Sequence, residues 1–284
     1  MTQSTVTSAG PGTAADRDLK ARHRAMWALG DYPSVAEEVI PALGAELVAE
    51  AGVGPGQAVL DVAAGSGNVA VRAALSGAQV VAADLTPALL EAGAARARQV
   101  GATVEWVEAD AEDLPFPDAS FDVVTSCVGV MFAPHHERAA DELVRVCRPG
   151  GTVALTAWTP EGFIGQLFAA VRPYAPTPPP GAQPAPRWRD KGHLREILGD
   201  RVEVRTAERR TLTVDRFTGP EDFRDFFATR YGPTVALYRS HADDAEALAG
   251  LDAALTGVAD RFGRRDGGGF SMGWEYLLLV GRRR

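Results

Sequence analysis

Cysteine is scarce in this chain of 284 residues, with two in total. Two cysteines cannot build the disulfide framework of a small extracellular scaffold. Long apolar runs are also lacking, and none approaches the roughly 18 residues of a membrane-spanning helix. Residues 1–15 lack the basic-then-apolar order of a secretory signal and are expected to form a disordered tail. These absences favour a cytoplasmic protein.

Positive charge is in deficit, because Lys and Arg number 29 against 37 Asp and Glu, which gives a formal net charge of −8. Nucleic acids and anionic membranes are bound through basic patches, so neither is expected as a partner. The apolar fraction of 46% and the charged fraction of 23% are typical of globular proteins. A chain of this length can bury a sizeable core.

Short apolar runs alternate with helical patterns in the first half of the chain. The expected strands are 58–62, 79–83, 103–107, 121–126 and 152–158, and the expected helices are 68–75, 87–100 and 135–147. Thr86 followed by Pro87 predicts a capped start for the second of these helices. This alternation is typical of a parallel sheet covered by helices on both faces, so the predicted fold class is α/β, doubly wound.

The flanking regions are expected to be mainly helical. Helical patterns cover 16–27 and 34–51, where Ser34 and Glu37 match a capping box and Pro41 predicts a break. Seven prolines between 173 and 186 predict a loop. The remaining expected elements are a strand at 202–214, helices at 220–238 and 243–262, and a strand at 274–280. The two late helices are expected to form a cap over the edge of the sheet.

The segment 59–68, with the sequence VLDVAAGSGN, is the most informative part of the chain. A strand ends in Asp61, and a glycine-rich turn then opens a helix. Ligands of parallel sheets bind at the carboxyl ends of the strands, and glycines let a ligand approach the backbone closely. The segment therefore predicts a ligand site.

Two ligand classes fit this turn. Gly65, Gly67 and Ala70 satisfy the dinucleotide fingerprint, in which Asp84 would take ribose hydroxyls, so a nicotinamide-dependent oxidoreductase is one interpretation. Asp61 argues against it, because a carboxylate beside the turn repels a pyrophosphate. A cationic ligand, with an ammonium and a sulfonium, suits that carboxylate better.

Three further segments agree with the second interpretation: ADAEDLPF at 109–116, FDVV at 121–124 and RPGG at 148–151. In this order and spacing the chain resembles class I S-adenosylmethionine-dependent methyltransferases, in the small-molecule group of the ubiquinone/menaquinone-biosynthesis C-methyltransferases (methyltransferase type 11 domain). The resemblance covers about residues 55–160. Ala63 departs from the family, which usually has glycine there, and its methyl group is tolerated if φ is negative.

The resemblance implies a Rossmann-like core with a mostly parallel, seven-stranded sheet. It also implies an N-terminal helical segment and a helical cap inserted before the last strand. The expected regions are a tail at 1–15, helices covering the cofactor site at 16–52, a cofactor-binding core at 53–160, and an acceptor-side region at 161–284.

The implied cofactor is S-adenosyl-L-methionine, with S-adenosyl-L-homocysteine as the product. Asp84 would accept hydrogen bonds from both ribose hydroxyls. Asp110 would meet the adenine amino group and Ala111 its edge, while Leu85 and Val128 would enclose the ring. The expected cofactor-binding residues are Asp61, Ala63, Gly65, Gly67, Asn68, Asp84, Leu85, Asp110, Ala111, Glu112, Cys127, Val128, Trp27 and Tyr32.

The implied reaction is an in-line transfer of the methyl group to an O, N or C atom of a small apolar or aromatic metabolite. The predicted substrate pocket consists of Met131, Phe132, Trp158, Phe226, Phe227 and Tyr231. His135, His136 and Tyr32 are the candidate catalytic residues, because a base is needed where the acceptor must lose a proton. His23, His193 and His241 are weaker candidates.

No histidines and carboxylates show metal-ligand spacing, so we expect a metal-independent reaction. The partner is expected to be a small-molecule acceptor, and the protein a monomer or homodimer. A non-catalytic S-adenosylmethionine-binding protein is a further alternative, which no sequence feature excludes.

Overall fold

The computed structural model describes residues 12–177 and 182–284. Within them an eight-stranded sheet runs in the order β3-β2-β1-β4-β5-β8-β6, with β7 paired to β8. The first five strands are parallel, and β8 is antiparallel to both neighbours, β5 and β6. The bounds are β1 Ala58–Val62, β2 Gln79–Asp84, β3 Val104–Glu108, β4 Phe121–Cys127, β5 Cys147–Trp158, β6 Val202–Val214, β7 Gly263–Asp266 and β8 Gly269–Arg283.

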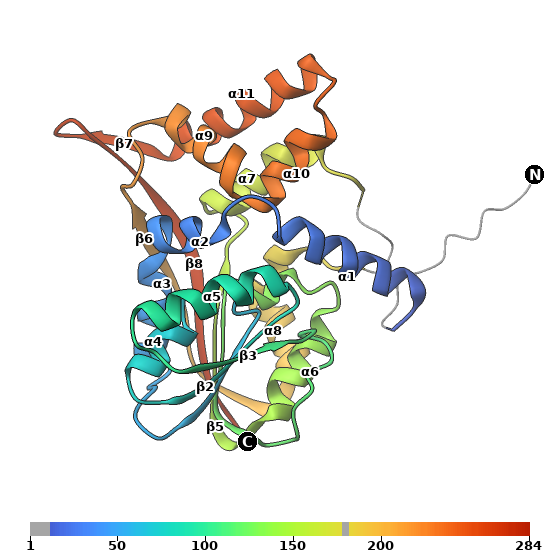
Figure 1. Ribbon diagram of the computed structural model, residues 1–284, viewed down its shortest axis with the longest axis vertical. Helices are drawn as coiled ribbons and strands as arrows, with labels where there is room; N and C mark the ends of the chain where they lie inside the picture. The colour runs from blue at the N-terminus through green and yellow to red at the C-terminus, as the bar shows by residue number, and fades with distance from the viewer. Residues whose placement is uncertain (1–11, 178–181) are drawn as a thin grey trace, which may run out of the picture.

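Helices cover both faces of this sheet, as Figure 1 shows. On one face α3, α4 and α5 pack together with β1 to β5, and on the other α6 and α8 pack against each other. The helices are α1 Ala14–Trp27, α2 Tyr32–Ser34, α3 Pro41–Glu50, α4 Ala70–Leu75, α5 Pro87–Gln99, α6 His136–Val146, α7 Phe163–Val171, α8 Lys191–Leu198, α9 Pro220–Arg230, α10 Gly232–Ser240 and α11 Ala245–Phe262. The predicted doubly wound α/β fold is confirmed, although β7 makes an eighth strand where seven were expected.

The N-terminal segment differs from the prediction in two respects. Residues 1–11 of the predicted tail at 1–15 lie outside the described residues. Helix α1 already begins at Ala14, because the Thr13 side chain accepts the Asp16 N–H at 3.1 Å. Ser34 does not start the next helix. Asp31 caps it instead, accepting the Ser34 N–H at 3.3 Å, and a π-helical turn, η1 (Val35–Val39), leads to the predicted break at Pro41.

Two further boundaries were predicted wrongly, and one predicted cap lacks its hydrogen bond although the helix begins where it was expected. Thr86 occupies the cap position of α5, but its side chain makes no capping hydrogen bond. Cys147 starts β5 instead of ending α6, because it pairs with Phe121 before the register shifts. The predicted helix 220–238 is two helices, since Pro233 cannot donate a backbone hydrogen bond and the chain turns at Tyr231.

Several elements escaped the sequence patterns. The nine residues of α7 form a short, mainly apolar run, and such a run does not distinguish a helix from a strand. The start of α8 did carry a signal, because the Asp190 side chain accepts N–H groups of Gly192 and His193. The proline-rich stretch forms only short 3₁₀ turns, at Arg172–Tyr174 and Ala185–Arg189, within the part that the structure describes.

The cap lies at the end of the sheet where α1 crosses the molecule (Figure 1). Its helices α9, α10 and α11 stand between β6 and β8 in sequence, and α7 packs against α11. Rings of the cap form an aromatic cluster with β8, in which Phe163 stacks on Trp274 at 4.8 Å between centroids. In the described residues no helix is both long and apolar enough to cross a membrane.

Trp106 of β3 fills the space between two glycines. A Cβ added at Gly67 would lie 2.5 Å from the indole ring, and one added at Gly93 of α5 would lie 2.4 Å from it. The packing of α5 on the sheet therefore depends on glycine at both positions.

This packing yields a stability prediction. In a helix interior Gly→Ala normally stabilises by about 1 kcal/mol. Gly93→Ala is expected to destabilise by about 1–3 kcal/mol instead, because the new methyl group overpacks Trp106. Urea denaturation measures the change.

Gly257→Ala in α11 is the matched control, since nothing lies within 4 Å of its added Cβ, and this variant is expected to gain stability. If Gly93→Ala gained stability as well, the proposed role of Trp106 would be contradicted.

Candidate functional site

A cavity opens at the carboxyl ends of the parallel strands. It encloses about 1000 Å³ of space, including solvent at its mouth. Its floor is formed by the loops that follow β1, β2, β3 and β4, and its roof includes α1 and α2. A concave site at this edge of the sheet suits a small-molecule cofactor.

Three aspartates at the ends of neighbouring strands line the cavity: Asp61, Asp84 and Asp110. Asp84 accepts the N–H groups of Gly65 and Thr86, both at 2.8 Å. It thereby fixes the glycine turn of β1 from the end of β2. Burial nevertheless raises the pKa of Asp84, because these hydrogen bonds only partly compensate for the loss of water.

Asp61 is the most deeply buried of the three. Its oxygens accept the Ala70 N–H at 3.1 Å and the Thr125 hydroxyl at 3.0 Å. Burial raises the pKa of Asp61 to about 7. This carboxylate thus anchors the start of α4, and it also faces the cavity, where a cation would favour its ionised form.

The glycine turn is strained at Ala63, whose φ is +52°. The condition stated for tolerating its methyl group, a negative φ, is therefore not met. The left-handed region costs an alanine about 1–2 kcal/mol relative to the right-handed one. The neighbouring loop adapts to this residue, since a Cβ at Gly129 would lie 2.4 Å from the Ala63 carbonyl oxygen.

Buried polar atoms in the turn lack partners within the described residues. The Ser66 hydroxyl and the Asn68 Oδ1 atom are both buried without a hydrogen bond, and both residues line the cavity. Buried polar groups are normally hydrogen-bonded, so a polar ligand in the cavity would satisfy them. Ser66 was missed by the sequence analysis, and only its place between two glycines could have pointed to it.

Aromatic rings wall one side of the cavity. Trp27 packs edge-on against Tyr32 at 5.5 Å and Phe132 at 5.0 Å between centroids. All three line the cavity, and Tyr231 stands behind them, 5.7 Å from Trp27. Burial raises the pKa of the Tyr32 hydroxyl, which therefore stays protonated.

Most of the expected cofactor residues do line this cavity, whereas Gly67 and Glu112 are absent from its lining as the described residues form it. Gly67 instead packs against Trp106. Of the expected substrate pocket, Phe132 alone belongs to the lining. The others pack inside the protein, among them Met131, Trp158, Phe226 and Phe227, each at most 4% exposed.

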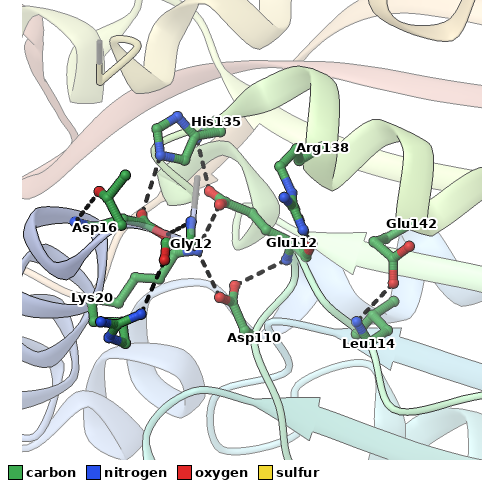
Figure 2. A network of polar contacts seen from close by, with 11 residues as sticks. Gly12, Asp16, Lys20, Asp110, Glu112, Leu114, His135, Arg138 and Glu142 are labelled. Carbon is green, nitrogen blue, oxygen red and sulfur yellow. Dashed lines mark hydrogen bonds and ion pairs between the residues drawn. The ribbon is translucent and has the colours of Figure 1, made fainter. Parts of the chain in front are cut away.

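Of the three candidate catalytic residues, Tyr32 lines the cavity, whereas His135 and His136 lie away from the lining. His135 Nε2 is 3.1 Å from Asp16 Oδ1 in the network of Figure 2. His136 is fully buried, and its Nδ1 atom is 2.9 Å from His193 Nε2 of α8. The structure instead brings His23, a weaker candidate, into the lining from α1. Burial, with help from Arg22 and Lys20, lowers the pKa of His23, so its ring is neutral at pH 7.

One group of possible metal ligands appears in the described residues. Asp16, Glu112 and His135 each place a ligand atom within 4.8 Å of the others. Lys20 stands among them, with its Nζ atom 2.6 Å from Glu112 and 3.1 Å from Asp16. The ammonium group therefore supplies the positive charge that these carboxylates need.

Comparisons with known proteins identify the class of this site. A family model described as a methyltransferase domain matches residues 60–155. A demethylmenaquinone methyltransferase of Clavibacter sepedonicus is 46% identical over 101 residues, covering 35% of this chain and 40% of its own. The chain belongs to the class I S-adenosylmethionine-dependent methyltransferases and is an enzyme of this kind.

Relatives that match nearly the whole chain include mycobacterial proteins. The uncharacterized protein Rv1405c of Mycobacterium tuberculosis is 49% identical over 269 residues, covering 95% of this chain and 97% of its own. The chain belongs to one family with this protein.

Solved structures share the fold. A putative methyltransferase from Bacillus halodurans has a TM-score of 0.55 at 23% identity, covering 84% of this chain and 97% of its own. A geranyl diphosphate methyltransferase in complex with GPP and sinefungin has a TM-score of 0.51 at 21% identity, covering 86% and 77%.

The buried pair of His136 and His193 leads to a prediction about pH. Burial, followed by the charge of the neighbouring histidine, lowers the pKa of His136 to about 4, and burial also lowers the pKa of His193. In the unfolded chain both histidines have a pKa of about 6.5. Below that pH the unfolded state binds protons that the folded state does not, so the free energy of unfolding is expected to fall between about pH 6.5 and about pH 4.

The expected slope is at most about 1.4 kcal/mol per pH unit for each histidine. Urea denaturation across this range measures it. The double variant His136→Asn, His193→Asn is expected to have a shallower slope, and an unchanged slope would show that other groups are responsible.

Proposed function

We propose that the cavity binds S-adenosylmethionine and that the enzyme transfers the methyl group to a small, uncharged, apolar or aromatic metabolite. The observation that carries this proposal is the meeting of three strand-end aspartates and a glycine turn in one cavity. The unpartnered Ser66 and Asn68 atoms support it, because an amino acid moiety would offer them hydrogen-bond partners.

Each aspartate has a proposed role. Asp84 uses one acceptor site on each oxygen for backbone N–H groups, which leaves capacity for two ribose hydroxyls. Asp110 would accept a hydrogen bond from the adenine amino group, beside Ala111. Asp61 would balance the positive charge of the ligand from the end of β1. Leu85 and Val128 would enclose the adenine ring.

The cofactor, when bound, supplies a methyl group on a positively charged sulfur. The chain would contribute positioning and exclusion of water, through the ring wall of Trp27, Tyr32 and Phe132. The protonated Tyr32 hydroxyl would donate a hydrogen bond. His23 offers a neutral imidazole that can accept a proton. His135 and His136 lie outside the lining and have no part in the proposed methyl transfer.

The charge of the cavity supports an uncharged acceptor. Among the described residues of the lining there are three carboxylates but no lysine or arginine. An acceptor with a carboxylate or phosphate would meet like charges and no counterion. The name of the Clavibacter relative, a demethylmenaquinone methyltransferase, agrees with an apolar acceptor. Geranyl diphosphate, the acceptor class in the name of one structural neighbour, fits less well because of its charge.

Calorimetric titration with S-adenosylhomocysteine, with NAD in parallel, tests the cofactor. Binding of the first and none of the second is expected. Asp84→Ala should abolish binding of S-adenosylhomocysteine, because its carboxylate also holds the glycine turn. Asp118→Ala, at an exposed carboxylate paired with Arg145, is the control and should bind like the wild type.

Binding of NAD, or full affinity in Asp84→Ala, would contradict the proposed site.

A matched pair of probes tests the acceptor class. With a labelled methyl donor, 2-naphthol is expected to be methylated faster than 3-hydroxy-2-naphthoate, because the described lining offers the added carboxylate no lysine or arginine as a counterion. Product formation is counted after extraction. Faster methylation of the carboxylated probe would refute an uncharged acceptor.

A further inference from the structure

Lys20 of α1 places one positive charge among three carboxylates. Its Nζ atom lies 2.7 Å from Asp110, 2.6 Å from Glu112 and 3.1 Å from Asp16 (Figure 2). An ammonium group has three hydrogens, so each carboxylate can receive one. The Lys20 side chain is only 13% exposed, which makes these ion pairs less screened than surface pairs.

These carboxylates belong to different parts of the site. Asp110 lines the cavity, whereas Glu112 lies behind it with its side chain fully buried. Glu112 also accepts the His135 N–H at 2.8 Å, and Asp16 accepts the Gly12 N–H at 2.9 Å. Lys20 thus connects the roof helix to the loop in which the proposed adenine-binding carboxylate stands.

The charges require this cation. Asp110 and Glu112 would repel each other without Lys20, and burial alone raises the pKa of Glu112. Burial alone would lower the pKa of Lys20, but its hydrogen bonds to Asp110 and Glu112 outweigh burial and raise it. Lys20 therefore stays charged and provides a counterion among these carboxylates.

The Asp110 carboxylate is held on two sides. Its Oδ1 atom accepts the Glu112 N–H at 2.9 Å, and its Oδ2 atom accepts from Lys20. A carboxylate has about four acceptor sites, so capacity for a ligand remains. These two contacts also limit the orientations in which the Asp110 carboxylate can accept a further hydrogen bond.

We propose that Lys20 is a positioning residue for cofactor recognition, which holds the Asp110 carboxylate aimed at the exocyclic amino group of the adenine. This inference rests on the proposed function, because it takes the ligand of the cavity to be an adenosyl compound. Through Lys20, the roof helix α1 would help to recognise the adenine base in addition to covering the cavity. If Lys20 only attached α1 to the rest of the fold, its loss would weaken the binding of every ligand of the cavity equally.

The test compares two ligands that differ at the base. S-adenosylhomocysteine carries the amino group, and S-inosylhomocysteine carries a carbonyl oxygen in its place, which would face Asp110 without a hydrogen to donate. The wild type is expected to prefer the adenosyl ligand by roughly 10- to 100-fold, the range of a hydrogen bond to a charged group. Lys20→Met should reduce this preference to a few-fold, because Asp110 loses its orientation. Lys20→Arg, which keeps the charge, should restore most of it.

Arg24→Met is the matched control on the same helix. Arg24 fastens α1 through the Leu85 carbonyl oxygen at 2.9 Å and through Glu108, but it does not touch Asp110. This variant is expected to weaken both ligands by the same factor and to keep the preference. Calorimetry gives all affinities, and circular dichroism verifies that each variant is folded.

The outcomes separate the inference from the proposed function. If the wild type binds neither ligand, the proposed function fails and the inference with it. If the wild type binds with a preference that Lys20→Met retains, the inference alone is overturned. Asp110→Asn provides an independent test where Lys20→Met does not fold: it should lose the preference, and adding Lys20→Gln, which removes the charge, should change the preference no further. A preference that survives in Asp110→Asn overturns the inference.

Discussion

The cavity depends on one repeated interaction, in which a strand-end aspartate accepts backbone N–H groups of a loop. Asp61 holds Ala70, Asp84 holds Gly65 and Thr86, and Asp110 holds Glu112. The Asp84–Gly65 hydrogen bond joins the connections after β1 and β2, and the other bonds brace each connection at the same edge of the sheet. The same carboxylate oxygens can accept further hydrogen bonds from a ligand. The groups that shape the cavity are therefore also the groups proposed to recognise the ligand.

The cost of this arrangement is visible in the chain. Burial raises the pKa of both Asp61 and Asp84, which are at most 8% exposed. Ala63 adopts a positive φ beside them, and Gly129 must leave room for it. Strain and buried charge gathered in one place are typical of functional sites, where the surrounding structure holds conformations that a loop alone would not keep.

Much of the fold could be predicted because its signals are local. The strands 58–62 and 202–214 have the predicted bounds, since apolar runs and turn residues mark their ends. The capping of α2 by Asp31 and the π-helical turn η1 carried no such signal, because that geometry depends on what the segment packs against. The short apolar run of α7 was ambiguous for another reason, since such a run does not distinguish a helix from a strand.

The site was predicted in part. Motif residues reached the cavity because their positions follow strand ends, a property of the sequence pattern. The contacts of Lys20 with Glu112 and of His136 with His193 join residues 92 and 57 positions apart, which no local pattern reveals. His23 entered the cavity for the same reason, since its place depends on how α1 lies across the fold.

The order of the strands has a consequence for folding during synthesis. β8 lies between β5 and β6, although it is the last strand of the described chain. Until residues 269–283 leave the ribosome, β5 keeps an open edge and β6 has no strand to pair with. The nascent protein therefore carries two exposed strand edges while its cap helices are already made, and this interval is when it is most exposed to aggregation.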